Sequence, residues 1–188
     1  RLKIHLVLRN HLLANAMRSL PVNDTLANDI ELYTYTREDL CSMKVLGIKP
    51  GSVPVLTRER VTYESNRHIH LVIFGASRQA ESLAIHTALT SHLPNYCRDN
   101  SLRTRITWFA DSNEDFLQFQ NMYGNLLEHC YRRFIDISDG NIRMQTIPPV
   151  HTGKQSDFID IEWEFVTGKS SSHITRHKLD RWSSDEER

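Results

Sequence analysis

The sequence predicts an α/β fold in which a parallel β-sheet is flanked by helices. The first observation is that strand-like and helix-like segments alternate along most of the chain, the order expected of a doubly wound sheet. The second is an apolar, β-branched run that stops at Gly75 and passes at once into a helix-forming run. The third is size, because 188 residues, 39% of them hydrophobic, suffice for one full α/β domain or two partial ones.

The N-terminal part predicts two strands and two helices. Asn10 is placed to cap the first helix, and Thr36 forms a capping box with Asp39 at the start of the second. Gly47 is placed to end that second helix. The expected strands are residues 2–8 and 30–35, and the expected helices are residues 11–20 and 37–46.

Residues 67–188 continue the alternation. Their clearest strand is 69–74 and their clearest helix is 76–92, whose small apolar residues suit close packing on a sheet. The remaining expected strands are 104–109, 134–137 and 159–165, and the remaining expected helices are 111–129 and 174–182.

The strand expected at 159–165 carries the clearest two-residue period in the chain. Asp160, Glu162 and Glu164 alternate there with apolar residues, which places the three carboxylates on one face. We interpret this face as solvated, with like charges that discourage edge-to-edge aggregation. The alternative is a site for a cation or a basic partner, because hard cations prefer clustered carboxylates.

One strand–turn–helix segment carries a degenerate phosphate-binding motif. The usual pattern, G-x-G-x-x-G, brings backbone N–H groups and a positive helix end to a phosphate. Here Gly75 is kept, while Ser77 and Ala80 replace the other two glycines. Ala80 suits a position that serves helix–strand packing, whereas Ser77 puts a Cβ where the backbone would approach a pyrophosphate. Arg78 suits an anion, and Asp111 stands one residue beyond the position expected for a ribose-binding acid.

The segments around this motif resemble the TrkA-N or RCK type of nucleotide-binding regulatory domain found in potassium transporters and channels. The chain looks closest to a bacterial branch with paired domains of this kind, sometimes fused to a ryanodine-receptor-like module. The residues that carry the resemblance are Phe74-Gly75, Ser91-His92-Leu93-Pro94-Asn95 and Arg105-Ile106-Thr107. The specific match covers a minor part of the chain, and the rest matches only as alternating strands and helices.

The resemblance implies a domain organisation. Residues 1–48 would be the C-terminal βαβα part of one Rossmann-like unit, and residues 49–66 a connector. Residues 67–188 would be the N-terminal half of a TrkA-N-like Rossmann unit. A further hypothesis is that the two parts complete a single sheet, with the strands of the first part beside residues 69–74. Because the chain begins at Arg1 in a strand-like pattern, we also expect it to be a piece of a longer polypeptide.

The resemblance also implies a function, a ligand and partners. The expected function is that of a non-catalytic nucleotide- or ligand-sensing regulatory domain in an ion (potassium) transport or channel-like protein. The implied ligand is NAD or ATP/ADP, bound by Gly75, Ser77, Arg78 and Ala80, with Asp111 near the ribose. The implied setting is a cytoplasmic homodimer attached to other domains, including those of a membrane-attached parent protein.

Two alternatives to this function stay open. One is an NAD(P)-dependent oxidoreductase domain, which requires a Tyr–Lys pair or a histidine general acid beside the nicotinamide. The other is a ligand-free structural or dimerisation module, in which the degenerate motif holds no cofactor. A ligand titration distinguishes these alternatives.

Composition and the remaining motifs exclude other classes. Lys+Arg and Asp+Glu both number 23, so no global charge attracts nucleic acid or an anionic membrane, and we expect no nucleic-acid partner. Three widely spaced cysteines favour a reducing compartment over a disulfide framework or a zinc knuckle. His68 with His70, and His173 with His177, have spacings that suit a metal. Such pairs arise easily among ten histidines, so we expect no metal site.

Overall fold

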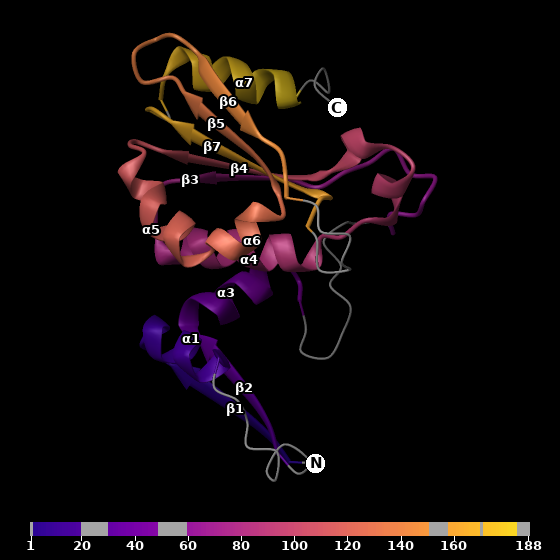
Figure 1. Ribbon diagram of the computed structural model, residues 1–188, viewed down its shortest axis with the longest axis vertical. Helices are drawn as coiled ribbons and strands as arrows, with labels where there is room; N and C mark the ends of the chain where they lie inside the picture. Colours follow the sequence, from indigo (N-terminus) through magenta and orange to yellow (C-terminus); the bar gives the residue numbers. More distant parts are fainter. Residues whose placement is uncertain (1, 20–29, 49–59, 151–157, 170, 184–188) are drawn as a thin grey trace.

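The computed structural model describes residues 2–19, 30–48, 60–150, 158–169 and 171–183, which form two β-sheets and their flanking helices (Figure 1). The smaller sheet pairs β1 (Leu2–Leu8) with β2 (Ile30–Thr36) in parallel. The larger sheet contains, in spatial order, β3 (His70–Phe74), β4 (Thr104–Ala110), β7 (Ile161–Thr167), β5 (Tyr131–Asp136) and β6 (Arg143–Ile147). The helices are α1 (His11–Ser19), α3 (Arg37–Val45), α4 (Arg78–Thr90), α5 (Glu114–Met122), α6 (Gly124–Glu128) and α7 (His173–Ser183), with 3-10 turns at Pro94–Cys97 and Asn100–Leu102.

The predicted fold class is confirmed: the chain is α/β, with a Rossmann-like, mostly parallel sheet flanked by helices. The strands β3, β4, β7 and β5 run parallel, and only β6 in the larger sheet runs antiparallel, against β5. The last strand, β7, inserts between β4 and β5, which follow one another along the chain.

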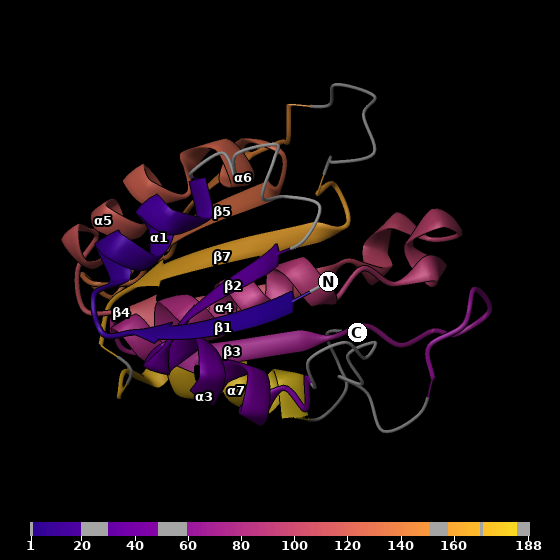
Figure 2. The ribbon, with the colours of Figure 1, turned by 90° about the horizontal axis from the view of Figure 1, so that it is seen from below.

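The hypothesis of a single sheet is wrong. β1 and β2 pair with each other, and neither belongs to the sheet that contains β3. Helices α3 and α4 pack together between the two sheets, and the smaller sheet is nearest the viewer when the molecule is seen from below (Figure 2). The structure therefore has two units. The N-terminal unit contains β1, α1, β2 and α3, the second unit contains the larger sheet with its helices, and the two are in contact where α3 packs on α4.

Local signals fixed the helix boundaries of the N-terminal unit well. The Asn10 side chain accepts from the N–H groups of Leu12 and Leu13 at 2.9 and 3.2 Å. The Thr36–Asp39 capping box is present in both directions, at 3.1 and 2.8 Å. Gly47 follows α3 with φ at 67°, a left-handed conformation that glycine adopts at little cost.

Four elements differ from the expectation. The strand expected at 134–137 is β5, which begins at Tyr131 and ends at Asp136. The helix expected at 111–129 is divided at Tyr123 into α5 and α6. Strand β6 was not predicted, because four of its five residues are exposed and show no apolar alternation. Strand β7 begins at Ile161, which leaves Asp160 outside it. Residues 49–59 of the expected connector lie outside the described part of the chain. The C-terminal residues 184–188 also lie outside it.

The larger sheet is covered on both faces. On one face the apolar side chains of α4, α5 and α6 pack on the sheet around Trp108, Trp163 and Phe165. On the other face Ile174 and Trp182 of α7 pack against a smaller cluster. That smaller cluster consists of Phe109, Ile135, Ile137 and Val166, with Val72 beside it.

The acidic face of β7 is buried rather than solvated, so the favoured interpretation is wrong. Glu162 and Glu164 are both 3% exposed, since a central strand in a mostly parallel sheet is covered on both faces. Arg133 of β5 joins them, with Nε 2.9 Å from Glu162 and Nη1 3.3 Å from Glu164. Asp160 pairs instead with His92 at 2.9 Å. The two strand carboxylates therefore serve an internal ion-pair network.

Within the described residues, no helix combines the length and the apolar character needed to cross a bilayer.

Candidate functional site

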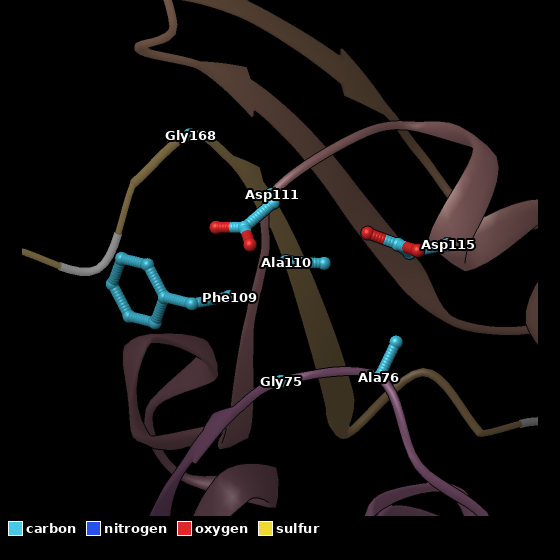
Figure 3. A pocket seen from close by; sticks show the side chains of 7 residues that line it. All are labelled: Gly75, Ala76, Phe109, Ala110, Asp111, Asp115 and Gly168. Atoms are coloured by element: carbon cyan, nitrogen blue, oxygen red, sulfur yellow. The ribbon is translucent and has the colours of Figure 1, made fainter.

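A pocket of about 270 Å³ lies at the carboxyl ends of β3, β4 and β7 (Figure 3). Ligands of open α/β sheets bind at this edge, because the loops that follow parallel strands converge there. The described residues that line the pocket are Gly75, Ala76, Phe109, Ala110, Asp111, Asp115 and Gly168.

The floor of the pocket is the turn after β3. Gly75 has φ at +83°, a conformation that side chains rarely adopt, and the space where a Cβ would stand is open. Its N–H donates to the carbonyl of Phe109 at 2.9 Å, and its own carbonyl accepts from the buried Trp108 indole at 2.9 Å. The turn is thus fixed from both sides, and its open surface faces the pocket.

The first residues of α4 make contacts within the helix and with the core. Ser77 is the N-cap, and its hydroxyl accepts from the N–H of Ala80 at 3.2 Å. Arg78 pairs with Glu81 at 3.3 Å and stands outside the described lining. Ala80 is buried in the core between helix and sheet, the packing role expected of this position. These three residues shape the helix entry, while the neighbouring Ala76 lines the pocket.

Two carboxylates supply the charge of the pocket. Asp111 directly follows β4, and its side chain reaches the lining although it stands one residue past the expected position (Figure 3). Asp115 enters from the first turn of α5, where it also accepts from the N–H of Ser112 at 3.1 Å. Both charged residues of the described lining are therefore acidic.

Gly168, which directly follows β7, lines a further side of the pocket. Its N–H donates to the carbonyl of Ala110 at 2.9 Å, which ties the end of β7 to the end of β4. Its φ is +141°, and an added Cβ would stand 2.6 Å from Cγ1 of Ile137. The neighbouring Thr167 donates to the side chain of Asn113 at 2.5 Å and so anchors the loop between Asp111 and Asp115.

Aromatic rings adjoin one side of the pocket. Phe109 is almost fully buried and stacks on Phe74, with ring centres 4.8 Å apart and planes 13° apart. Phe74 is 47% exposed, directly precedes Gly75 and stands outside the described lining. Trp182 of α7 meets Phe109 edge-on at 6.3 Å and supports it from the other side.

The structure thus brings together only part of the predicted site. Gly75 and Asp111 line the pocket, whereas Ser77, Arg78 and Ala80 do not appear in its described lining. Sequence reasoning missed the roles of Ala76, Phe109, Ala110, Asp115 and Gly168. The available signal was position, because each of these residues lies within two residues of the end of a strand or the start of a helix, although which strand ends meet at one pocket depends on the order of strands in the sheet.

Helix α4 connects the pocket to the N-terminal unit. Gln79 donates to the hydroxyl of Ser42 at 2.8 Å, and Ser82 donates to the carboxylate of Asp39 at 3.0 Å. His86 lies 3.2 Å from the same Asp39 oxygen. Residues 79, 82 and 86 share one face of α4, so a helix that begins at the pocket holds α3 by its side chains.

The other groups considered as candidates are the histidine pairs and the three cysteines. His70 bonds through Nε2 to Thr107 at 2.8 Å, and the described residues contain no group of three or more His, Cys, Asp or Glu arranged to hold a metal. Cys41 and Cys97 are exposed and free. Burial raises the pKa of the Cys130 thiol to about 12, so this cysteine is protonated at neutral pH.

Comparisons of the chain with protein-family models, curated proteins and solved structures give no match.

Proposed function

We propose that this chain is a regulatory domain that binds a nucleotide or a related small ligand at the carboxyl edge of its larger sheet. The observation that carries the proposal is the double role of α4. One end of this helix adjoins the pocket through Gly75 and Ala76, and one of its faces bonds α3 through three side chains. A ligand that shifts the start of α4 thereby changes the contacts of the N-terminal unit.

The mechanism is a shift between two arrangements of the units. A ligand changes this equilibrium only by binding one arrangement more tightly than the other. The helix distance from Arg78 to His86 is about 12 Å at 1.5 Å per residue, so a displacement at the pocket reaches Asp39 within one rigid element. The contacts that Asp39 and Ser42 make with α4 include hydrogen bonds between side chains, which can be exchanged for others if the two units shift.

The proposed setting is an ion-transport or channel-like protein, with potassium as the ion. This part of the proposal is supported by the resemblance of the Phe74-Gly75 turn and the Arg105-Ile106-Thr107 strand to TrkA-N and RCK domains. Asp111 supports the ligand class, because an acid after the second strand of such a unit accepts from ribose hydroxyls.

The experiment that tests the function is a thermal-shift titration of the whole chain with NAD⁺, NADH, ATP, ADP, adenosine and cyclic dinucleotides. A ligand at 100 times its Kd stabilises the folded state by about 2.7 kcal/mol, a rise of several degrees for a chain of this size. We expect at least one compound to give this rise.

Two variants assign the rise to the pocket. Asp111→Ala removes the proposed ribose acceptor and is expected to abolish the shift. Glu114→Gln removes an exposed acid outside the described lining and is expected to leave it unchanged. If no compound stabilises the chain, or if Asp111→Ala behaves like Glu114→Gln, the pocket is not a sensing site.

A further inference from the structure

We propose that the pocket binds an uncharged nucleoside and discriminates against ligands that carry a phosphate. This inference rests on the proposed function and narrows it: the ligand class is a nucleoside rather than a nucleotide or a dinucleotide. It departs from the expectation that Gly75, Ser77 and Arg78 contact a phosphate.

The charge of the pocket is the first argument. The charged residues of its described lining are Asp111 and Asp115, and both are acidic. A phosphate placed between them faces two like charges. A ribose, in contrast, offers two neighbouring hydroxyls as donors, and a carboxylate accepts hydrogen bonds from both. The lining therefore favours a neutral polyhydroxyl group.

The helix entry is the second argument. At a helix N-terminus a phosphate oxygen accepts from free backbone N–H groups. Here the hydroxyl of Ser77 already accepts from the N–H of Ala80. The Arg78 guanidinium is paired with Glu81 at 3.3 Å, which offsets its charge. The N–H groups of Gly75 and Ala80 and the Arg78 side chain are thus engaged within the protein, which leaves fewer donors for a phosphate at this turn.

Size and aromatic surface are the third argument. The volume of about 270 Å³ lies just below the range of roughly 300–1,000 Å³ typical of small-molecule pockets. It suits one nucleoside better than the two joined nucleotides of a dinucleotide. Phe109 of the lining is stacked on the half-exposed ring of Phe74, and this aromatic pair offers a surface on which a base can stack.

The test is isothermal titration calorimetry of the whole chain with adenosine, guanosine, cytidine and uridine and with their 5′-monophosphates. Each nucleoside that binds is expected to bind about tenfold more tightly than its monophosphate, the size of effect that like charges a few ångströms apart produce near a surface. This ratio is expected to fall in about 1 M salt, where the Debye length is only about 3 Å.

Variants assign the discrimination to particular side chains. Asp115→Asn keeps the shape and removes one charge, so it is expected to raise AMP affinity about threefold while adenosine affinity stays within twofold. The matched control, Glu114→Gln, is expected to change neither. Arg78→Ala is expected to leave both affinities unchanged, because its guanidinium is engaged by Glu81.

The outcomes separate this inference from the proposed function. If a monophosphate binds as tightly as its nucleoside, or more tightly, a cation outside the described lining, such as the exposed Lys169, reaches the phosphate. That result overturns the discrimination and leaves the sensing function in place. If neither nucleosides nor their monophosphates bind, this inference falls, and the sensing function then depends on the thermal-shift titration with NAD⁺, NADH and the cyclic dinucleotides.

Discussion

The buried ion-pair network on β7 gives the sharpest prediction about stability. Arg133 of β5 reaches Glu162 through Nε at 2.9 Å and Glu164 through Nη1 at 3.3 Å. Both glutamate side chains are only 4% exposed. Arg133→Ala removes the cation that these carboxylates share and leaves them in the sheet.

The loss of stability in Arg133→Ala depends on which partners the two glutamates keep. Removing one member of a buried ion pair destabilises a protein by about 3–5 kcal/mol, because the other charge stays buried without compensation. The lower end applies here, since Arg133 is 35% exposed and Arg105 still stands 3.8 Å from Glu162. Glu164 also keeps the Thr107 hydroxyl, which donates to it at 2.7 Å. We therefore expect a loss of about 3 kcal/mol from a total stability of about 5–15 kcal/mol.

Urea unfolding measured by tryptophan fluorescence checks this value. The control is Arg143→Ala, because Arg143 forms an exposed ion pair with Asp139 that is expected to contribute less than about 1 kcal/mol. In Arg133→Ala/Glu162→Gln, one of the two carboxylates that lose Arg133 is replaced by a neutral amide, so part of the lost stability is expected to return. A loss below 1 kcal/mol in Arg133→Ala, equal to that of the control, would refute the reasoning.

Three further predictions follow from single residues. Gly168→Ala places a Cβ 2.6 Å from the Ile137 side chain, so it is expected to lower the free energy of unfolding in urea by about 2–4 kcal/mol. The control is Gly124→Ala, where the space for a Cβ is open, and it is expected to be neutral or stabilising. Asp39→Ala removes the carboxylate that bonds Thr36, Ser82 and His86, and it is expected to lower the free energy of unfolding by roughly 3 kcal/mol. Glu38→Ala on the same turn is expected to lower it by less than about 1 kcal/mol, and equal losses would contradict the role of Asp39. Burial raises the pKa of the Cys130 thiol from 9.0 to about 12, so only the unfolded chain ionises this thiol between these two pH values. The free energy of unfolding is therefore expected to be unaffected by Cys130 below pH 9 and to fall above it. A thiol reagent at pH 8 is expected to label only the exposed Cys41 and Cys97 of the folded chain.

Features that depend on neighbours in the sequence were predictable. The Thr36–Asp39 capping box and the left-handed Gly75 after β3 are local, because the residues that define them lie within one turn. The pairing of Arg78 with Glu81 is also local and was readable from the i, i+3 spacing, although the sequence reasoning assigned that arginine to a phosphate.

Features that depend on sheet order were not predictable. The burial of Glu162 and Glu164 requires Arg133, which lies 31 residues before Glu164 and reaches it because β5 pairs with β7. Gly168 joins the pocket because β7 inserts between β4 and β5. Period-2 alternation on a central strand looks the same whether the polar face meets water or paired cations, so the pattern alone favoured the solvated interpretation.

Hydrogen exchange of the whole chain with and without saturating adenosine, and in parallel ADP, tests the central claim most directly. If the pocket acts through α4, the compound that binds slows or speeds amide exchange both at residues 75–81 and in α3, residues 37–45. The change in α3 is expected to become smaller in Gln79→Ala, which removes the bond from α4 to Ser42 but leaves the contacts of Ser82 and His86 with Asp39. Exchange that changes only around the pocket, with α3 unaltered, would show that the ligand site and the N-terminal unit are not coupled.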